Sequence, residues 1–265
     1  MKIIAHVGFH KTGTTSFQDL IRTNLSRLPS YVVVEVRGRP LADKLRMELH
    51  DFHMNPSSIG LQKVRTSFDD ILNNATNKNA EIVFISLESS CGLARIMAPQ
   101  SLYSTGRQVL QLYAEASLGH ELKLLFSTRN VKDWVRSLHG HIAKHGNSGM
   151  SFGAFASADP IQNFDWTMLI TRLSAGLDAR IATTSLEETK DTRLGALSDF
   201  LYEFLNEEQL QSWVPVPKSN EGLPPALVRF LLSPPISALP TGTRKRLIKL
   251  LHAIYRKRKF FSFGR

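Results

Sequence analysis

A short basic turn near the start of the chain combines the residue types that bind phosphate. Gly8 and Gly13 bracket Lys11, and three hydroxyl residues follow at positions 14–16. Glycines let a backbone fold closely around an anion, a lysine supplies a positive charge, and hydroxyls donate further hydrogen bonds. The turn therefore has the composition of a phosphate cradle.

The residues on either side predict a strand before this turn and a helix after it. Ile3, Ile4 and Val7 form an apolar, β-branched run suited to a strand that is buried on both faces. Apolar residues then recur at helical spacing from Phe17 to Leu28. The first amides of a helix lack intrahelical partners, and the helix dipole is positive at that end. The predicted helix would therefore direct its N-terminus at the bound anion.

The spacing in the turn differs from that of an ATP-binding loop. That motif places lysine directly after its second glycine, followed by serine or threonine. Here Thr14 follows Gly13, and Lys11 lies two residues before it. An ordinary strand-to-helix turn without a ligand is the alternative interpretation.

The segment GFHKTGTTSFQ, residues 8–18, resembles the 5′-phosphosulfate-binding loop of sulfotransferases. These enzymes use 3′-phosphoadenosine 5′-phosphosulfate (PAPS), and the segment is most similar to a bacterial branch with the loop HKTGTT. The resemblance implies a second motif, an arginine at the end of a later strand and a serine eight residues further on. Arg129 follows the apolar run 122–128, and Ser137 has the implied spacing.

The resemblance also implies a role for each matching residue. Lys11 would offset the charge that builds on the leaving phosphate, and Arg129 and Ser137 would hold the 3′-phosphate. Lys218 lies where sulfotransferases have a late basic loop, although the local match is poor. Taken singly, these residues also fit a surface salt bridge, a solvated hydroxyl and an exposed loop. The predicted nucleotide-binding residues are Gly8, His10, Lys11, Thr12, Gly13, Thr14, Thr15, Ser16, Arg129, Ser137 and Lys218.

Sulfuryl transfer to a hydroxyl group needs a base that accepts the acceptor's proton. Glu88 is the first candidate, because it follows the third predicted strand, where the bacterial branch commonly has Ser-Ser-Glu. The stretch here is Ser86-Leu87-Glu88, a departure from that pattern. Glu35, after the second predicted strand, is the second candidate, and His10 in the loop and His50 or His53 are further candidates. Glu88 could instead orient the loop or cap the following helix.

The pattern of the whole chain predicts an α/β protein. Predicted strands at 3–7, 31–36, 82–86, 122–128 and 179–185 alternate with helices, including helices at 99–118 and 194–205. This alternation predicts a P-loop-type three-layer fold, with a central parallel sheet of about five strands flanked by helices. Ligands of such sheets bind at the carboxyl ends of the strands. We expect one domain over residues 1–240 and a basic C-terminal helix or tail over 241–265.

Composition limits the classes of partner and compartment. The 33 basic and 23 acidic residues give a net charge of +10, which predicts an anionic partner. The single cysteine, Cys91, fits a reducing compartment, and no apolar run reaches the roughly 20 residues of a membrane span. The predicted buried strand starts at once, which leaves no room for a signal peptide. We expect a cytoplasmic protein whose basic tail either contacts an anionic membrane at its inner face or packs on the domain.

The sequence therefore predicts an enzyme, a sulfotransferase that moves a sulfuryl group from PAPS to a hydroxyl or amine of an acceptor. The family implies a carbohydrate or glycolipid acceptor, the product 3′-phosphoadenosine 5′-phosphate (PAP), and no metal. Three alternatives stay open. They are a nucleotide or sugar kinase on a related fold, a non-catalytic nucleotide-binding relative, and a nucleic-acid-binding protein that uses the basic tail. For the sulfotransferase itself, no nucleic-acid partner is expected.

Overall fold

The computed structural model describes residues 1–93, 102–145, 150–159 and 161–217, with a few isolated positions between 230 and 251. The described residues form two compact units. The first contains residues 1–131 and the segment that begins at Phe164, and the second contains residues 132–163. The predicted boundary at residue 240 lies outside the continuously described ranges and stays a prediction.

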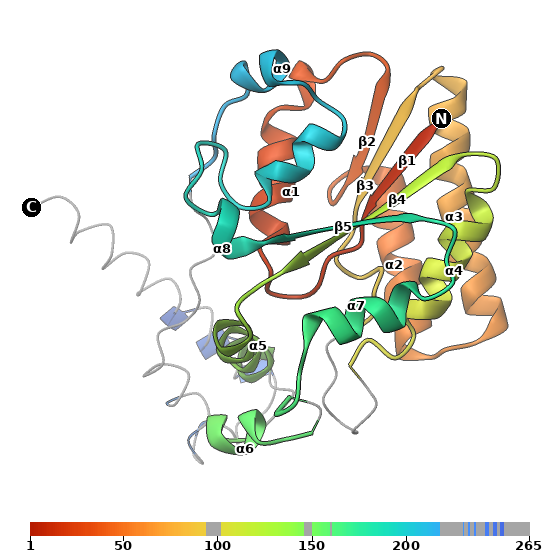
Figure 1. Cartoon of the computed structure of the whole chain (residues 1–265). Helices are drawn as coiled ribbons and strands as arrows, with labels where there is room; N and C mark the ends of the chain where they lie inside the picture. Colours follow the sequence, from red (N-terminus) through yellow and green to blue (C-terminus); the bar gives the residue numbers. More distant parts are fainter. Residues whose placement is uncertain are drawn as a thin grey trace, which may run out of the picture. The chain divides into compact units, whose positions relative to one another are not determined.

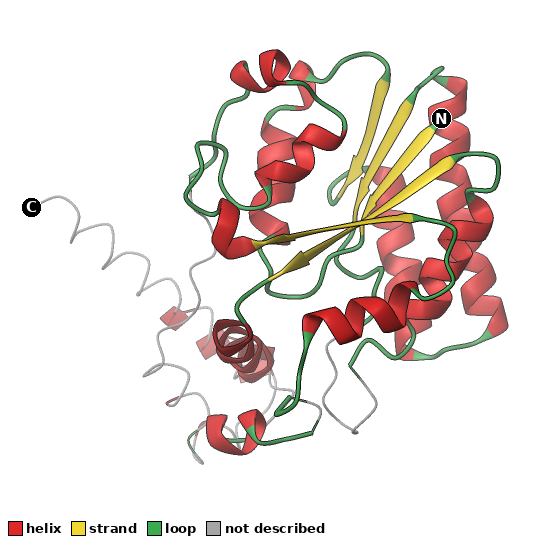
Figure 2. Ribbon diagram, viewed as in Figure 1, coloured by secondary structure: helices red, strands yellow, loops and turns green. Residues whose placement is uncertain are grey.

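The first unit contains a sheet of five strands that all run parallel (Figures 1 and 2). Their order across the sheet is β2-β3-β1-β4-β5, so the first strand lies at the centre. The predicted α/β class with a parallel sheet of five strands is therefore confirmed. The strands are β1 (Lys2–His6), β2 (Val32–Val36), β3 (Ile82–Ser86), β4 (Glu121–Thr128) and β5 (Arg180–Ser185).

Helices flank this sheet on both sides (Figure 1). In the first unit they are α1 (Thr14–Thr23), α2 (Pro40–Met54), α3 (Ser58–Asn77), α4 (Gly106–Ala116), α7 (Trp166–Ser174), α8 (Leu186–Thr189) and α9 (Glu207–Gln211), with 3₁₀ turns η1 (Leu25–Arg27) and η2 (Ser198–Glu203). Helix α5 (Val131–His145) leads into the second unit, which also holds α6 (Phe152–Ala156).

Apolar side chains from alternating strand positions form the core on each face of the sheet. On one face, Ile4 and Phe84 pack with Phe17 of α1 and Phe200 of η2 in a single buried cluster. Successive strand residues point to opposite faces, so the buried Ile3 and its neighbours on the other strands face α2, α3 and α4 (Figure 1). A sheet covered on both faces holds its strand ends rigidly, which is what positions the loops at those ends.

The strand register brings the carboxyl ends of the strands to one edge. His6 of β1 pairs with Ser86 of β3, and Thr128 of β4 pairs with Ser185 of β5. The segments that follow these strands therefore leave the sheet side by side. They contain the basic turn, Glu88 and Arg129, as the sequence predicts.

Two predicted helices are shorter than their hydrophobic patterns indicate. In the described part of the predicted helix 99–118, α4 begins only at Gly106, because Tyr103 adopts a left-handed φ of 58° and Gly106 packs against the Cys91 backbone. Over 194–205 only η2 is helical, since Leu197 has a φ of 63° and its amide donates to Thr189 Oγ1 at 2.7 Å. The apolar residues there are buried as expected, but in a looped chain.

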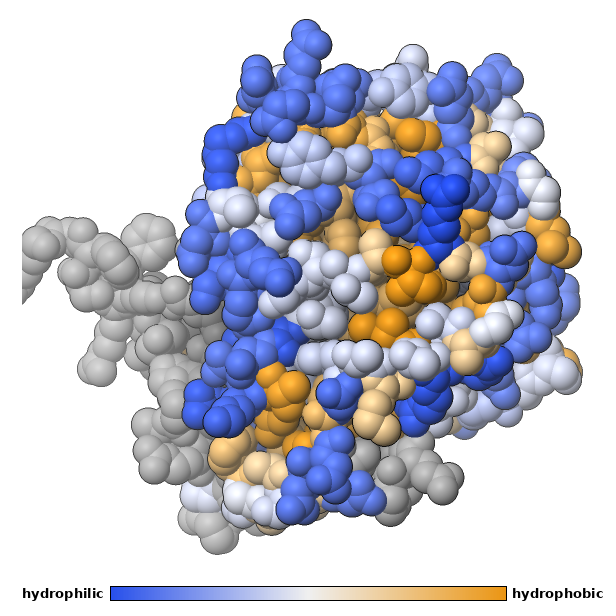
Figure 3. Space-filling view, viewed as in Figure 1, coloured by the Kyte–Doolittle hydropathy of each residue, from blue (hydrophilic) through white to orange (hydrophobic). Residues whose placement is uncertain are grey.

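The described surface mixes apolar and polar residues. Met168 on α7 and Ile181 on β5 are exposed, and on the face shown in Figure 3 the apolar side chains form small patches between polar ones. Single exposed apolar residues are normal on protein surfaces. None of the described helices is both long enough and apolar enough to span a membrane.

Candidate functional site

The basic turn connects β1 to α1 through two residues with left-handed backbones. Lys11 has a φ of 69° and Gly13, the N-cap of α1, a φ of 102°. The first helical hydrogen bond runs from the Phe17 amide to the Gly13 carbonyl at 3.2 Å. The amides of residues 14–16 therefore form the first turn of α1, where a helix attracts anions.

A row of buried polar side chains lies beneath this turn and crosses three strands. His6 Nδ1 is 2.9 Å from Ser86 Oγ, and His6 Nε2 is 3.2 Å from Ser127 Oγ. Ser127 Oγ is in turn 2.7 Å from Thr12 Oγ1, and the Thr12 hydroxyl donates to the Phe9 carbonyl at 2.6 Å. We call these residues, together with Gln18, the polar row. It ties the turn to β1, β3 and β4.

The two ends of the polar row fix the direction of its hydrogen bonds. Gln18 Nε2 can only donate, and it lies 3.4 Å from Ser86 Oγ, while the Phe9 carbonyl at the other end can only accept. Each hydroxyl between them then donates toward Phe9, so His6 accepts at Nδ1 and donates from Nε2–H. This arrangement requires a neutral imidazole. Burial lowers the pKa of His6 to about 3, which agrees with that requirement.

We predict that His6 makes the protein sensitive to acid. Its pKa is lowered to about 3 in the folded state and is about 6.5 when unfolded, so the unfolded chain binds the extra proton. Stability is therefore intact above pH 6.5 and decreases by about 1.4 kcal/mol per pH unit below it. The free energy of unfolding in urea is measured between pH 7 and 4.5 for wild type and His6→Gln. Its slope against pH should be smaller in the variant, by the amount that corresponds to about one bound proton.

His120→Gln, at an exposed position, is the matched control and should keep the wild-type slope. The same slope in wild type and His6→Gln would contradict the neutral buried state of His6.

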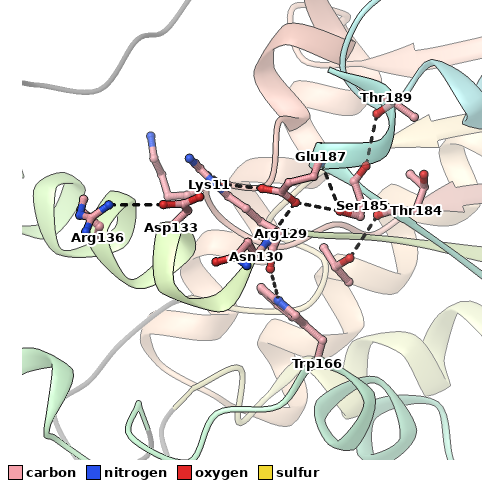
Figure 4. Close-up of polar contacts among 11 residues, drawn as sticks. Lys11, Arg129, Asn130, Asp133, Arg136, Trp166, Thr184, Ser185, Glu187 and Thr189 are labelled. Carbon is pink, nitrogen blue, oxygen red and sulfur yellow. Dashed lines mark hydrogen bonds and ion pairs between the residues drawn. The ribbon is translucent and has the colours of Figure 1, made fainter. Parts of the chain in front are cut away.

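Arg129 lies against the basic turn. Its Nη1 donates to the Lys11 carbonyl at 3.3 Å, although the two residues are 118 positions apart. Trp166 Nε1 donates to the Arg129 carbonyl at 2.6 Å (Figure 4). The Trp166 ring also lies 4.9 Å from the ring of Phe9. The arginine at the end of β4 is thus fixed to the same turn that carries Lys11.

Two buried polar atoms beside the turn have no hydrogen-bond partner among the described residues. They are Thr14 Oγ1, in a side chain that is almost fully buried, and Arg129 Nε. A buried donor without a partner is costly, and a ligand can satisfy it. One atom is in the first turn of α1 and the other in a guanidinium group, so both suit an anionic ligand.

His10 interacts electrostatically with both Glu88 and Lys11. Burial lowers the pKa of His10, Lys11 lowers it further, and the Glu88 carboxylate opposes both effects. The His10 amide also donates to the Tyr103 hydroxyl at 3.2 Å. A lowered pKa keeps the imidazole of His10 neutral at pH 7, so it can accept a proton. Two of the predicted bases, His10 and Glu88, are therefore close enough to interact electrostatically.

His53 holds the segment that carries Glu88. Its Nε2 donates to the Ser89 carbonyl at 2.7 Å, and its Nδ1 accepts from Thr105 Oγ1, also at 2.7 Å. Burial lowers the pKa of His53 to about 4, so this residue is neutral at pH 7. Through it, α2 is fixed to the turn after β3 and to the start of α4.

Glu35 has a different set of contacts from those of His10 and Glu88. Its carboxylate is almost fully buried, accepts from the Ala42 amide at 3.3 Å and lies 3.7 Å from Arg39 Nη2. Burial raises the pKa of Glu35, and the Arg39 guanidinium partly offsets this. These contacts are those of a residue that stabilises the N-terminus of α2.

Four further predicted residues complete the set, and the structure describes three of them. Thr15 and Ser16 are half-buried in the first turn of α1. Ser137 is half-buried on α5 in the second unit, so its pairing with Arg129 stays a prediction. Lys218 lies outside the described residues.

Sequence reasoning missed the supporting residues His6, Ser86, Ser127 and Glu187. Each of the first three is a polar residue at or next to the carboxyl end of its strand. That position was the available signal, since a polar residue within a buried strand must find a hydrogen-bond partner. Glu187 follows β5, a strand that carried no motif linking it to the site.

No family model matches this sequence, and no curated protein matches it. In the described part of the chain, no group of three or more His, Cys, Asp or Glu residues could hold a metal ion. The case for a function therefore depends on the turn, Arg129 and the residues around them.

Proposed function

We propose that this protein is a PAPS-dependent sulfotransferase. The observation that carries the proposal is the hydrogen bond from Arg129 to the Lys11 carbonyl. It joins the turn that resembles a 5′-phosphosulfate loop to the arginine that the same resemblance assigns to the 3′-phosphate. The two phosphates of one nucleotide need binding groups that lie this close together.

The described residues fit an anionic nucleotide. The first turn of α1 offers amides and the Thr14 hydroxyl, which lacks a partner among the described residues, and Arg129 offers unused N–H groups. PAPS, when bound, would supply the sulfuryl group, and its bond to the 5′-phosphate would break with the electron pair staying on PAP. Lys11 would stabilise the negative charge that develops on that phosphate.

Glu88 and His10 are the candidates for the base that removes the proton from the acceptor. The two groups interact electrostatically, and the neutral imidazole of His10 can accept a proton directly, with the Glu88 carboxylate stabilising the imidazolium that results. Glu35 is less suited, because its carboxylate is engaged at the N-terminus of α2. A carbohydrate or glycolipid acceptor, a cytoplasmic location and a membrane contact through the basic C-terminal residues remain proposals from the sequence.

The proposal is tested by thermal unfolding in the presence of PAP, ADP and ATP with Mg²⁺. A ligand that binds only the folded state stabilises it by about 2.7 kcal/mol at 100 times its Kd. We expect PAP to raise the melting temperature well above the value with ADP. Arg129→Ala should reduce the effect of PAP to that of ADP, because the 3′-phosphate loses its guanidinium partner.

Arg107→Ala, a change in an exposed arginine on α4, is the matched control and should respond like wild type. Equal effects of PAP and ADP on wild type would overturn the assignment and favour the kinase, and so would stabilisation by ATP with Mg²⁺ alone. No effect of any nucleotide would also overturn it.

A further inference from the structure

Glu187 lies beside Arg129 because their strands are neighbours. The last residues of β4 and β5, Thr128 and Ser185, are partners in the parallel register, so the segments that follow them leave the sheet together. Glu187 Oε1 is 3.9 Å from Arg129 Nε, and Figure 4 shows the carboxylate reaching from α8 toward the arginine. The arginine proposed to bind the 3′-phosphate thus already has an anion next to it.

The position of Glu187 does not depend on Arg129. Its Oε2 accepts from the Asn130 amide at 3.0 Å and from Ser185 Oγ at 2.8 Å. At 3.9 Å the contact with the guanidinium is an ion pair without a hydrogen bond. If Arg129 turns toward a ligand, the carboxylate therefore stays where it is.

Arg129 keeps the capacity to bind a second anion. Its Nη1 is used by the Lys11 carbonyl, while its buried Nε has no hydrogen-bond partner among the described residues. The side chains of Arg129 and Glu187 are 26% and 33% exposed, so a phosphate can approach the pair from solvent. A phosphate bound there would lie close to a fixed negative charge.

We infer that Glu187 is a specificity-determining residue that weakens the binding of the 3′-phosphate at Arg129 and thereby speeds the release of PAP. This inference rests on the proposed function. A carboxylate beside a phosphate opposes its binding by like-charge repulsion, which solvent and salt screen at a half-exposed site. Product release limits the turnover of many enzymes. A lower affinity for PAP would therefore allow faster turnover.

The test is titration calorimetry of the full chain with PAP and with ADP. Glu187→Gln removes the charge, while its amide oxygen can still accept from Asn130 and Ser185. We expect PAP to bind roughly three- to tenfold more tightly to this variant than to wild type. ADP, which lacks the 3′-phosphate, should bind equally to both, and the gain for PAP should shrink in high salt.

Glu188→Gln is the matched control. Glu188 also carries a negative charge on α8, but its carboxylate accepts from the Ser185 amide at 3.0 Å, a contact that glutamine can make as well. This variant should bind both nucleotides like wild type.

The outcomes separate this inference from the proposed function. If wild type prefers PAP to ADP and Glu187→Gln binds PAP no more tightly, Glu187 positions Arg129 and the inference fails alone. If wild type binds PAP and ADP equally, the proposed function fails and the inference fails with it. An equal gain for PAP and ADP would show a general charge effect and would also overturn the inference.

Discussion

Lys11→Met should lower the rate of sulfuryl transfer from PAPS by about 100- to 1,000-fold, the usual cost of removing one group that stabilises transition-state charge. PAP affinity should fall much less, because the first-turn amides of α1 and Arg129 remain. Methionine has a similar length and can keep the left-handed φ of 69° at the same strain as lysine. The measurement is single-turnover loss of label from PAPS, followed as labelled sulfate with water as acceptor and as labelled sugar sulfate with a panel of sugars.

Lys63→Met is the matched control for Lys11→Met. Lys63 is exposed on α3, and its loss removes the same charge from the protein. This variant should keep the wild-type rate. A Lys11→Met protein that retains more than half of the wild-type rate would rule out the proposed role of Lys11.

Gly8→Ala should destabilise the fold and the turn together. A Cβ atom at Gly8 would lie 2.6 Å from His6 Nε2 and 2.8 Å from Ser127 Oγ, inside the polar row. Overpacking a buried site costs about 1–3 kcal/mol, and a broken buried hydrogen bond adds about 1 kcal/mol. For a chain of this size we expect the melting temperature to fall by roughly 5–10 °C, with weaker stabilisation by PAP.

Two further variants check the cause of the Gly8→Ala effect. Gly153→Ala adds the same methyl group where nothing lies within 4 Å, and it should leave the melting temperature nearly unchanged. His6→Ala removes the ring that the new Cβ would meet, so the double variant should lose less stability than the two single changes added together. Additive losses would show that the contact with His6 is not the cause.

The sheet and the basic turn could be predicted because their signals are local. Short runs of apolar or β-branched residues marked the strands, and glycines around Lys11 marked the turn within a few residues. The proximity of Arg129 to Lys11 could also be predicted, because the carboxyl ends of parallel strands share one edge. That contact is present in the structure at 3.3 Å.

Features that depend on the pairing of distant residues could not be predicted. His6, Ser86 and Ser127 lie in three strands that are far apart in the sequence, and only the strand order places them next to one another. The sequence also could not show that α2 begins against the carboxylate of Glu35. The helical spacing of apolar residues over 194–205 correctly predicted that these residues are buried. It wrongly predicted an α-helix, since a looped chain can bury leucines at the same spacing.

The central place of β1 in the sheet sets the order in which this chain can acquire its structure during synthesis. Residues 2–6 leave the ribosome before their partners, residues 82–86 of β3 and 121–125 of β4. The first strand must therefore wait for about 80 further residues before it can pair with β3, and for about 120 before it can pair with β4. Such pairing between distant segments is slow and leaves apolar surface open to aggregation. During that time the nascent chain would be a natural client for chaperones.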